Sequence, residues 1–587
     1  MTGLSTFAGL WAAGRILQFC VRLQIPSPWT HVTAILLGIQ ALSFLVQIVS
    51  IANVASRPVL SAIWWSLAAL GAVMVVAQVR VRLAVAFPKS DQWALLPIVI
   101  VGTTVAADLL IAIAPSTKFD ELHYHMLLPS RIVTDGALRL YREPWEGAIL
   151  PDMLFQISSA PAHAVGYPDA PNVVSWGISI TLLWFAWRVI RAQGKPIAWC
   201  AVWVGSLGVG IYPAVWDVTG GAHAVGDLSM AAALIAFCTR ESLLASLSPP
   251  AYAAMFSIML LSAVTSKISV LPLCVIILCF GIWPLLRVSE ARVCRNVVGA
   301  AAIPWIVLFF PIVLWTWVQS GSPFGPILSG LFASPNFPND WSVDIRSTRE
   351  VNQVPLLMVL PNVLPSYSPL VWMGVIGAIF FSSLPKLTRA TLFLFLVLQC
   401  SLIYWLLPYD PRFLGGFHFG LLIAFAAFVT PHILERLSSA RSILLSSVLL
   451  LLPWLAMQIY YAQQFFPVSL GLEKRRFYER YVAFYNDYIQ LDQLLSNDTV
   501  ILVKDYQLSP YAPRPIFYDP ADLPKGKPVV LFARPESLPA TSLANYKCGK
   551  LIYSDSRAVT VTYRTPGQQP SIGPLEVRQL VRGAKNR

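Results

Sequence analysis

Charged residues are scarce in this sequence. Only 12% of its 587 residues are Asp, Glu, Lys or Arg, whereas 56% are apolar and the mean hydropathy is +0.64. A soluble chain would carry about twice that share of charge. The composition therefore excludes a soluble globular protein and indicates a polytopic α-helical membrane protein.

Motifs of several other protein classes are missing as well. The chain contains no CxxC pair and no Cys/His metal spacing, and Cys548 is the only one of its eight cysteines in the last 115 residues, so no disulfide framework is expected there. It contains no Gly-rich phosphate loop and no nucleophile elbow. We find no internal repeat, which weakens an inverted-repeat transporter interpretation. No apolar stretch followed by a small-residue cleavage site is present, so we expect the first span to act as an uncleaved signal.

Apolar runs long enough to cross a bilayer recur along the chain. We predict thirteen spans, near residues 30–50, 58–79, 93–114, 171–189, 197–213, 226–240, 250–264, 269–286, 297–318, 366–383, 390–407, 413–430 and 442–460. The earlier stretch 6–23 contains Arg15 and Arg22, which favours an interfacial helix rather than a span.

The basic residues set the predicted orientation. They give a net charge of +13, but they lie in short loops between spans rather than on one face, which argues against nucleic-acid binding. When the spans are counted alternately, one side holds Arg80, Arg82, Lys89, Arg188, Arg191, Lys195, Arg287, Arg292, Arg295, Lys386, Arg389, Arg436 and Arg441. The positive-inside rule makes that side cytoplasmic. The loops 115–170 and 319–365 and the C-terminal residues are then expected to face outward.

The C-terminal residues differ in composition from the rest of the chain. The last 115 residues hold 28 of the 71 charged side chains, which indicates a separate water-soluble domain. A helical pattern over residues 473–495 is followed by short apolar runs at 499–503, 528–532 and 551–553 with Pro, Asp and Gly between them. This order predicts a small α/β domain. We expect the final stretch, 567–587, to be partly disordered.

The segment 119–125, Phe-Asp-Glu-Leu-His-Tyr-His, places two acids and two histidines just after a predicted span. Ionisable groups at a membrane surface are costly to keep and therefore suggest chemistry. Asp120 is our candidate general base, with Glu121 as its helper; either acid can instead cap the following helix. His123, Tyr124 and His125 are candidate substrate ligands. Histidines two residues apart do not share a helical face, which disfavours a two-His metal site on a helix, and each could simply bond to backbone.

Two basic residues break the charge bias of the outward loops. Lys267 lies between two closely spaced spans, and Arg412 lies at the start of another. Each could bind a phosphate, Arg by a bidentate fork and Lys as a point charge. The alternatives are snorkelling to lipid headgroups and, for Arg412, pairing with Asp410.

Two more acids flank a predicted outward turn. Asp217 precedes it, and Asp227 enters the next span in Gly-Asp-Leu-Ser. An acid at the end of a span is expensive unless it is used or paired. Both acids are candidates for binding the acceptor, a metal ion or a facing lysine, and Asp227 could alternatively be a helix N-cap. The Gly/Pro run 320–326 is expected to shape a turn.

Taken in order, four short motifs resemble those of the GT-C superfamily of integral-membrane glycosyltransferases, which includes aminoarabinose and protein-mannosyl transferases. They are residues 119–125 with Pro129 and Asp135-Gly136, residues 226–228, residues 265–267, and residues 321–324 with the later Arg412-Phe413. Together they cover residues 93–430. The chain departs from the family pattern in having two additional spans before the usual first one and two histidines in the acidic motif.

The resemblance implies three regions. Residues 1–92 would form the interfacial helix and the two additional spans, and residues 93–470 the catalytic transmembrane domain. Its first outward loop, 115–170, would carry two juxtamembrane helices. Residues 471–587 would form the extracytoplasmic α/β domain. The expected location is a bacterial inner membrane, with the active site and this domain on the periplasmic side.

The resemblance also implies an activity. A sugar would pass from a polyprenyl-phosphate donor, with inversion, to a glycan, lipid or protein acceptor, with Asp120 as base and Lys267 and Arg412 on the donor phosphate. The reaction would need either no cofactor or a divalent cation. Membrane lipids would be the other partners, and no nucleic acid is expected. Three alternatives stay open: a lipid-linked oligosaccharide ligase or polymerase, a transporter or flippase, and a non-catalytic assembly subunit whose soluble domain is the working part.

Overall fold

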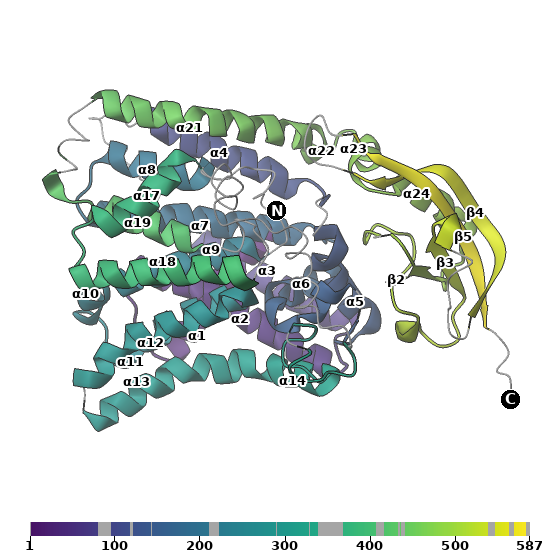
Figure 1. Ribbon diagram of the computed structural model, residues 1–587, viewed down its shortest axis with the longest axis horizontal. Coiled ribbons are helices and arrows are strands. Elements are labelled where there is room, and N and C mark those ends of the chain that lie inside the picture. Colours follow the sequence, from purple (N-terminus) through teal and green to yellow (C-terminus); the bar gives the residue numbers. More distant parts are fainter. Residues whose placement is uncertain are drawn as a thin grey trace.

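The computed structural model is mostly helical, with a small sheet at its C-terminal end (Figure 1). It describes residues 2–79, 95–117, 121–142, 144–209, 222–288, 290–327, 329–337, 368–406, 416–432, 435, 441–506, 508–537, 546–562 and 569–582.

Helices lie at all thirteen places where the sequence predicts a span. The helices of the bundle are α1 (Thr2–Cys20), α2 (Trp29–Ile51), α3 (Arg57–Val79), α4 (Leu95–Ile113), α7 (Ala170–Ala192), α8 (Ile197–Val209), α9 (His223–Cys238), α10 (Arg240–Leu244), α11 (Pro249–Val264), α12 (Leu271–Val288), α13 (Ala291–Pro304), α14 (Phe310–Ser320), α17 (Pro369–Phe380), α18 (Lys386–Leu406), α19 (Phe417–Phe428) and α21 (Arg441–Ala462).

Within the described ranges, six helical stretches are long and apolar enough to cross a membrane. They are Trp29–Ile51, Arg57–Val76, Leu95–Ile113, Ala170–Ala192, Ile268–Arg287 and Ala291–Ser320. Shorter apolar helices, among them α8, α9, α11, α17 and α19, pack with them. The chain is therefore built as a membrane protein, and the total of thirteen spans stays a prediction.

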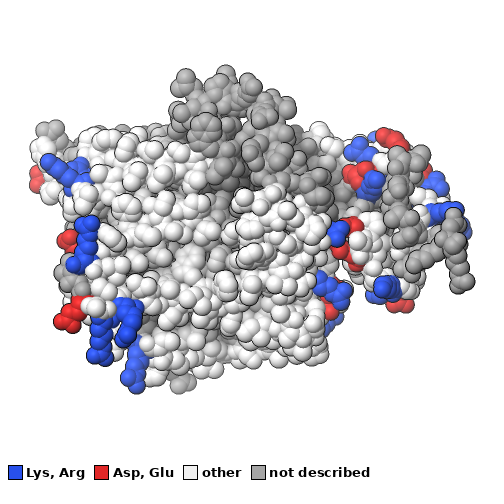
Figure 2. Space-filling model, turned by 60° about the horizontal axis from the view of Figure 1, so that its bottom comes forward, with Lys and Arg blue, Asp and Glu red and all other residues white. Residues whose placement is uncertain are grey.

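Charge is distributed unevenly along the long axis of the molecule. On the face drawn in Figure 2, Lys and Arg side chains gather at the end of the bundle remote from the C-terminal domain, with a few acids among them. Positive and negative side chains are mixed on the C-terminal domain itself. The apolar middle between these two ends is the band expected of a bundle surrounded by lipid.

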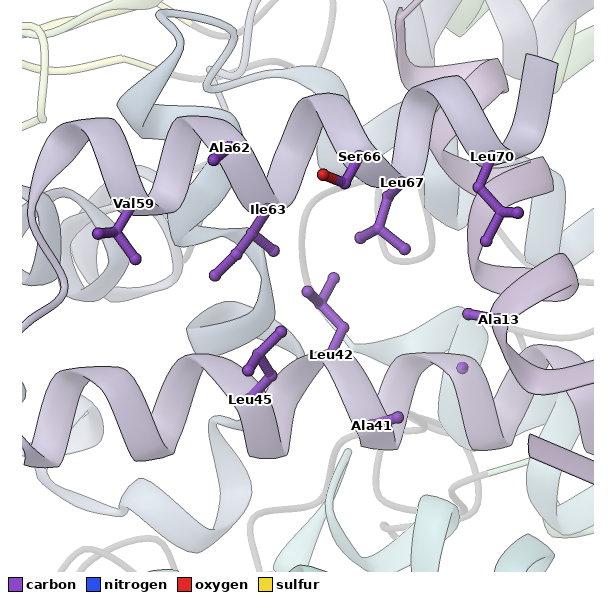
Figure 3. Close-up of a pocket in the computed structure, with 11 residues that line it drawn as sticks. Ala13, Ala41, Leu42, Leu45, Val59, Ala62, Ile63, Ser66, Leu67 and Leu70 are labelled. Atoms are coloured by element: carbon purple, nitrogen blue, oxygen red, sulfur yellow. The ribbon is translucent and has the colours of Figure 1, made fainter. Parts of the chain in front are cut away.

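Helix α1, predicted as interfacial, bridges α2 and α3. Gly9 contacts the backbone of Leu67 on α3, and the backbone of Leu10 contacts Gly38 on α2, so closely that no side chain would fit at either glycine. Beyond this crossing, α2 and α3 leave an apolar groove of about 540 Å³, with Ala13 of α1 at one end (Figure 3). The two additional N-terminal spans are thus tied together by close backbone packing.

The loop between α4 and α7 is structured. It contains a π-helical turn η2 (Glu121–His125), α5 (Leu127–Asp135), two 3₁₀ turns, η3 (Trp145–Ala148) and η4 (Leu150–Asp152), and α6 (Leu154–Ala164). Helix α6 packs on α5 and also on α2 and α3. Two helices, α5 and α6, therefore lie in this loop.

The C-terminal part forms the predicted α/β domain. After α22 (Phe466–Ser469) come α23 (Lys474–Tyr481), α24 (Tyr485–Leu494), β1 (Val500–Val503), β2 (Ile516–Phe517), β3 (Val529–Ala533), β4 (Tyr546–Val561) and β5 (Ser571–Arg582). The strand order is β2-β1-β3-β5-β4; β1 runs parallel to β2 and β3, and β5 runs antiparallel to β3 and β4.

The structure adds detail to two expectations for this domain. The helical pattern over 473–495 is divided into α23 and α24, because Phe484 adopts a left-handed backbone (φ 59°) just before α24. Within the stretch 567–587, expected to be partly disordered, residues 571–582 form β5, which buries Leu575, Val577 and Leu580 beside β3. Burial of these apolar side chains supplies the free energy that orders the strand.

Candidate functional site

Three of the predicted site residues lie outside the described residues: Asp120, Asp217 and Arg412. The others, on η2, α9 and the turn after α11, are described.

The η2 turn follows directly after Asp120 in the sequence. Its wide hydrogen bond joins the Met126 N–H to the Glu121 carbonyl oxygen at 2.9 Å. Glu121 and His123 are buried, whereas Tyr124 and His125 are partly exposed, with their rings 4.1 Å apart. The π-helical backbone thus gives the segment one buried pair and one accessible pair.

His125 is held by the first turn of α6. The amide nitrogen of Gln156 lies 2.7 Å from His125 Nδ1. The Gln156 amide can donate to Nδ1 or, turned over, accept from it, and which it does sets the tautomer of the ring. Gln156 itself is buried, which fixes the orientation of the imidazole from within the protein.

Sequence reasoning missed Asp152, four residues before Gln156 at the end of η4. Its carboxylate Oδ1 accepts a hydrogen bond from the backbone N–H of Ile268 at 2.6 Å. Ile268 begins the helical stretch that continues into α12, so the acid lies at a helix N-terminus, where negative charge is favoured. A single acid in the Leu-Pro-Asp of a long loop carries no motif, and its partner is 116 residues further along the chain.

Lys267 is the electrostatic partner of Asp152. Burial raises the pKa of the Asp152 carboxyl to about 6, and the positive charge of Lys267 and the Ile268 N–H oppose this rise. Both side chains are partly exposed. The structure thus places the predicted phosphate ligand Lys267 beside a carboxylate whose pKa burial raises to about 6.

Asp227 lies on α9, one residue after Gly226, which packs against the turn before Lys267. It is 2% exposed, and its Oδ1 has no hydrogen-bond partner among the residues that the structure describes. The N-cap interpretation is wrong, because α9 already begins at His223 and Asp227 is in its second turn. Gly226 faces the turn before Lys267: a Cβ at this glycine would lie 2.6 Å from the Ser266 hydroxyl.

The start of α19 closes on Asp227. Gly416, the residue before α19, has φ +80°, and a Cβ there would clash with the Asp227 backbone and lie 2.9 Å from its Oδ1. Arg412 stands four residues before Gly416 in the sequence. The described residues thus show three separate contacts: His125 with Gln156, Asp152 with Lys267 and Ile268, and Asp227 with Gly416.

The Gly/Pro run after α14 shapes a turn, as predicted. Gly321 and Gly325 both have positive φ, and Gly325 N–H bonds to the Ser322 carbonyl oxygen at 3.3 Å. Gly325 packs against the backbone of Ala148, just before η4. This turn therefore supports the segment that presents Asp152.

Metal ligation is not evident in the described part of the chain, where no three His, Cys, Asp or Glu side chains gather as ligands. Comparison with protein-family models finds no family that matches this chain, and no curated protein matches it significantly. Functional inference therefore rests on the residues themselves. They are the Asp152–Lys267 pair at a helix N-terminus, the partly exposed rings of Tyr124 and His125, and the buried carboxylate of Asp227.

Proposed function

We propose that the protein is a GT-C-type membrane glycosyltransferase that transfers a sugar from a polyprenyl-phosphate donor to an acceptor with inversion. One observation carries the proposal: Asp152 binds the backbone at Ile268, beside Lys267. Lys267 precedes the apolar stretch Ile268–Arg287. An ammonium at the end of a span suits a ligand whose tail lies in lipid and whose phosphate lies at the surface.

The proposed mechanism needs one base and one cationic site. Asp120 takes the proton of the acceptor hydroxyl, and the acceptor oxygen attacks the anomeric carbon from the face opposite the phosphate. The bond between the anomeric carbon and the phosphate oxygen breaks, and its electron pair leaves with the polyprenyl phosphate. Lys267 and Arg412 stabilise the charge that develops on this leaving group.

The remaining predicted residues take supporting roles in this proposal. Glu121, which is buried and follows Asp120 in the sequence, helps to orient the base. The accessible Tyr124 and His125 contact the substrate directly, and the buried His123 supports them. Asp217 and Asp227 contact the acceptor or balance the cationic site. Asp152 keeps Lys267 in position. A divalent cation stays an open requirement of the reaction.

The proposal includes an orientation. The bundle end with gathered Lys and Arg (Figure 2) is cytoplasmic by the positive-inside rule. The C-terminal domain and the loop 115–170 are then extracytoplasmic, on the periplasmic side of a bacterial inner membrane. The finer architecture, thirteen spans around a GT-C core, belongs to the same proposal.

The test uses purified full-length protein in lipid nanodiscs with polyprenyl-phosphate sugars and candidate acceptors. We expect Asp120→Asn to lower the transfer rate by about 10²- to 10⁴-fold, the scale of lost general-base catalysis. Asp498→Asn, a change in a turn of the C-terminal domain, is the matched control and should keep full activity. Wild-type activity in the Asp120→Asn variant would remove the proposed base.

The phosphate site is tested separately. Lys267→Ala should raise the donor KM by about tenfold or more, the effect of losing one charge-assisted hydrogen bond, and the double variant with Arg412→Ala should raise it further. Lys504→Ala, an exposed lysine of the C-terminal domain, is the control. An unchanged donor KM in the double variant contradicts a phosphate role.

A transporter is the second candidate, and Asp227 favours it, because a buried carboxylate inside an apolar helix often marks a transport path. Solute uptake into sealed vesicles without any glycosyl product would select that candidate. Transfer of whole oligosaccharides instead of single sugars would select a ligase.

A further inference from the structure

Ser116, three residues before the acidic segment 119–125, makes hydrogen bonds to α7 and to the C-terminal domain. The Ser116 N–H donates to Asp169 Oδ1 at 2.9 Å, and its hydroxyl oxygen accepts from Asn172 Nδ2 at 3.0 Å. Asp169 is the N-cap residue of α7, and Asn172 lies in the first turn of that helix. The carbonyl oxygen of Ser116 accepts a hydrogen bond from the hydroxyl of Tyr511, 3.0 Å away. Tyr511 belongs to the C-terminal domain, in the connection between β1 and β2.

Tyr518, which directly follows β2, contacts His123 within the acidic segment. The ring of Tyr518 meets the His123 ring edge-on, with centroids 6.2 Å apart. The hydroxyl of Tyr518 is itself fixed by the backbone of Leu508, accepting from its N–H at 2.9 Å and donating to its carbonyl at 3.2 Å. We call the stretch 508–519 the β1–β2 connection; it includes β2 itself and the two residues that follow it. The hydrogen bonds between Tyr518 and Leu508 stabilise this stretch where it contacts η2.

Two arginines of the first loop continue this contact. Arg131 Nη2 donates to the Ile516 carbonyl oxygen at 3.2 Å, and its guanidinium lies 4.1 Å from the centre of the Tyr141 ring. Arg142 lies 3.7 Å from an Asp519 carboxylate oxygen. The β1–β2 connection thus contacts the first loop before and after residue 120 in the sequence.

We propose that the β1–β2 connection of the C-terminal domain positions the acidic segment of the first loop, with Tyr511 as the positioning residue. This inference rests on the proposed function, in which Asp120 is the base. The C-terminal domain is then a part of the catalytic unit, and its removal or displacement releases Ser116 and His123 from their contacts with Tyr511 and Tyr518. Burial keeps the pKa of the Tyr511 hydroxyl well above its ordinary value, so the group remains a donor at every working pH.

Tyr511→Phe isolates this role. It removes the hydroxyl that reaches Ser116 and keeps the ring, which packs edge-on against Tyr478 with centroids 5.1 Å apart. We expect kcat to fall about tenfold, the value of one hydrogen bond. The donor KM should stay unchanged, because the variant leaves the Asp152–Lys267 pair intact.

Tyr553→Phe is the matched control. Its hydroxyl donates to Asp487 at 2.9 Å inside the same domain, away from the first loop. Both variants lose one tyrosine hydroxyl of the same domain, so both should lower the melting temperature, whereas only Tyr511→Phe should lose kcat. Equal kcat values for the two variants overturn the proposal.

A second readout separates this inference from the proposed reaction. Hydrogen exchange in residues 121–126, which include the Met126–Glu121 bond, should be faster in Tyr511→Phe than in the wild type and unchanged in Tyr553→Phe. If the wild-type protein transfers no sugar, the proposed function is wrong. Hydrogen exchange in residues 121–126 would even then show whether the β1–β2 connection orders that segment. Unchanged exchange in Tyr511→Phe sinks the positioning role.

Discussion

The carboxylate of Asp152 and the backbone N–H of Ile268 lie 2.6 Å apart and join the first loop to the start of α12. The bond does two things at once. It satisfies a backbone donor at a helix N-terminus, which would otherwise need water. It also holds a carboxylate beside Lys267, whose positive charge favours the ionised form of Asp152.

The pH dependence of activity follows from this relationship. Because the pKa of Asp152 is raised to about 6 by burial, the carboxyl is protonated below that pH and charged above it. If charged Asp152 holds Lys267 toward the donor, kcat/KM should rise between pH 5 and pH 7 with a midpoint near 6.

Asp152→Asn supplies the control for this profile. The amide oxygen can still accept from Ile268, but the side chain no longer titrates. The acid limb should therefore disappear and leave a lower, flat profile over this range, measured as kcat/KM in steps from pH 5 to pH 8. An acid limb that survives in Asp152→Asn belongs to another group and contradicts the assignment.

The sequence predicts helix positions well and side-chain pairs poorly, for a physical reason. A run of apolar residues indicates a buried helix whether lipid or another helix covers it. The bounds of α2, α3, α4 and α7 could therefore be predicted within a few residues. The bond of Asp152 depends on a backbone 116 residues away, which no local pattern records. Lys267 could be found because it breaks a charge bias, and that bias is a property of the whole chain.

The C-terminal domain shows the same limit. β1 and β3 are continuous apolar runs, typical of central strands buried on both faces. β5 alternates apolar with polar side chains and carries a Gly-Pro pair, so its composition favoured a disordered tail until pairing with β3 and β4 was known. Phe484 has a left-handed backbone that non-glycine residues rarely adopt, and nothing local predicts it.

Gly416 is expected to be intolerant of any side chain. Its φ of +80° disfavours an L-residue by about 1–2 kcal/mol, and a Cβ would also clash with the backbone of Asp227. Overpacking of this kind adds about 1–3 kcal/mol. Gly416→Ala should therefore lower the melting temperature of the purified protein and reduce transfer activity by displacing Asp227.

Gly166→Ala separates the cost of the backbone conformation from the cost of overpacking. Gly166 has the same backbone conformation (φ +81°), but a Cβ there would meet nothing within 4 Å. It should lower the melting temperature by the conformational term alone and leave activity intact. Equal losses in the two variants would mean that crowding against Asp227 contributes nothing.

Asp487 predicts a pH-dependent stability of the C-terminal domain. Its carboxylate is buried on α24 and accepts from Tyr553 of β4 at 2.9 Å; burial raises its pKa to about 6, and this hydrogen bond opposes the rise. A folded-state pKa above the unfolded value means that the folded state binds more protons between about pH 4 and pH 6. The contribution of Asp487 to the free energy of unfolding is therefore greatest at or below pH 4, declines as the pH rises to 6, and is lost above it.

The measurement is hydrogen exchange of β4, compared between wild-type protein and Asp487→Asn after correction for the intrinsic pH dependence of exchange. In the wild type, the stability of β4 should fall from pH 4.5 to pH 6.5. The variant should show a flatter profile, because its amide accepts the same Tyr553 hydrogen bond and cannot ionise. Tyr553→Phe should instead weaken β4 at every pH, since it removes the bond and leaves the acid. A variant profile as steep as that of the wild type would place the titrating group elsewhere in the domain.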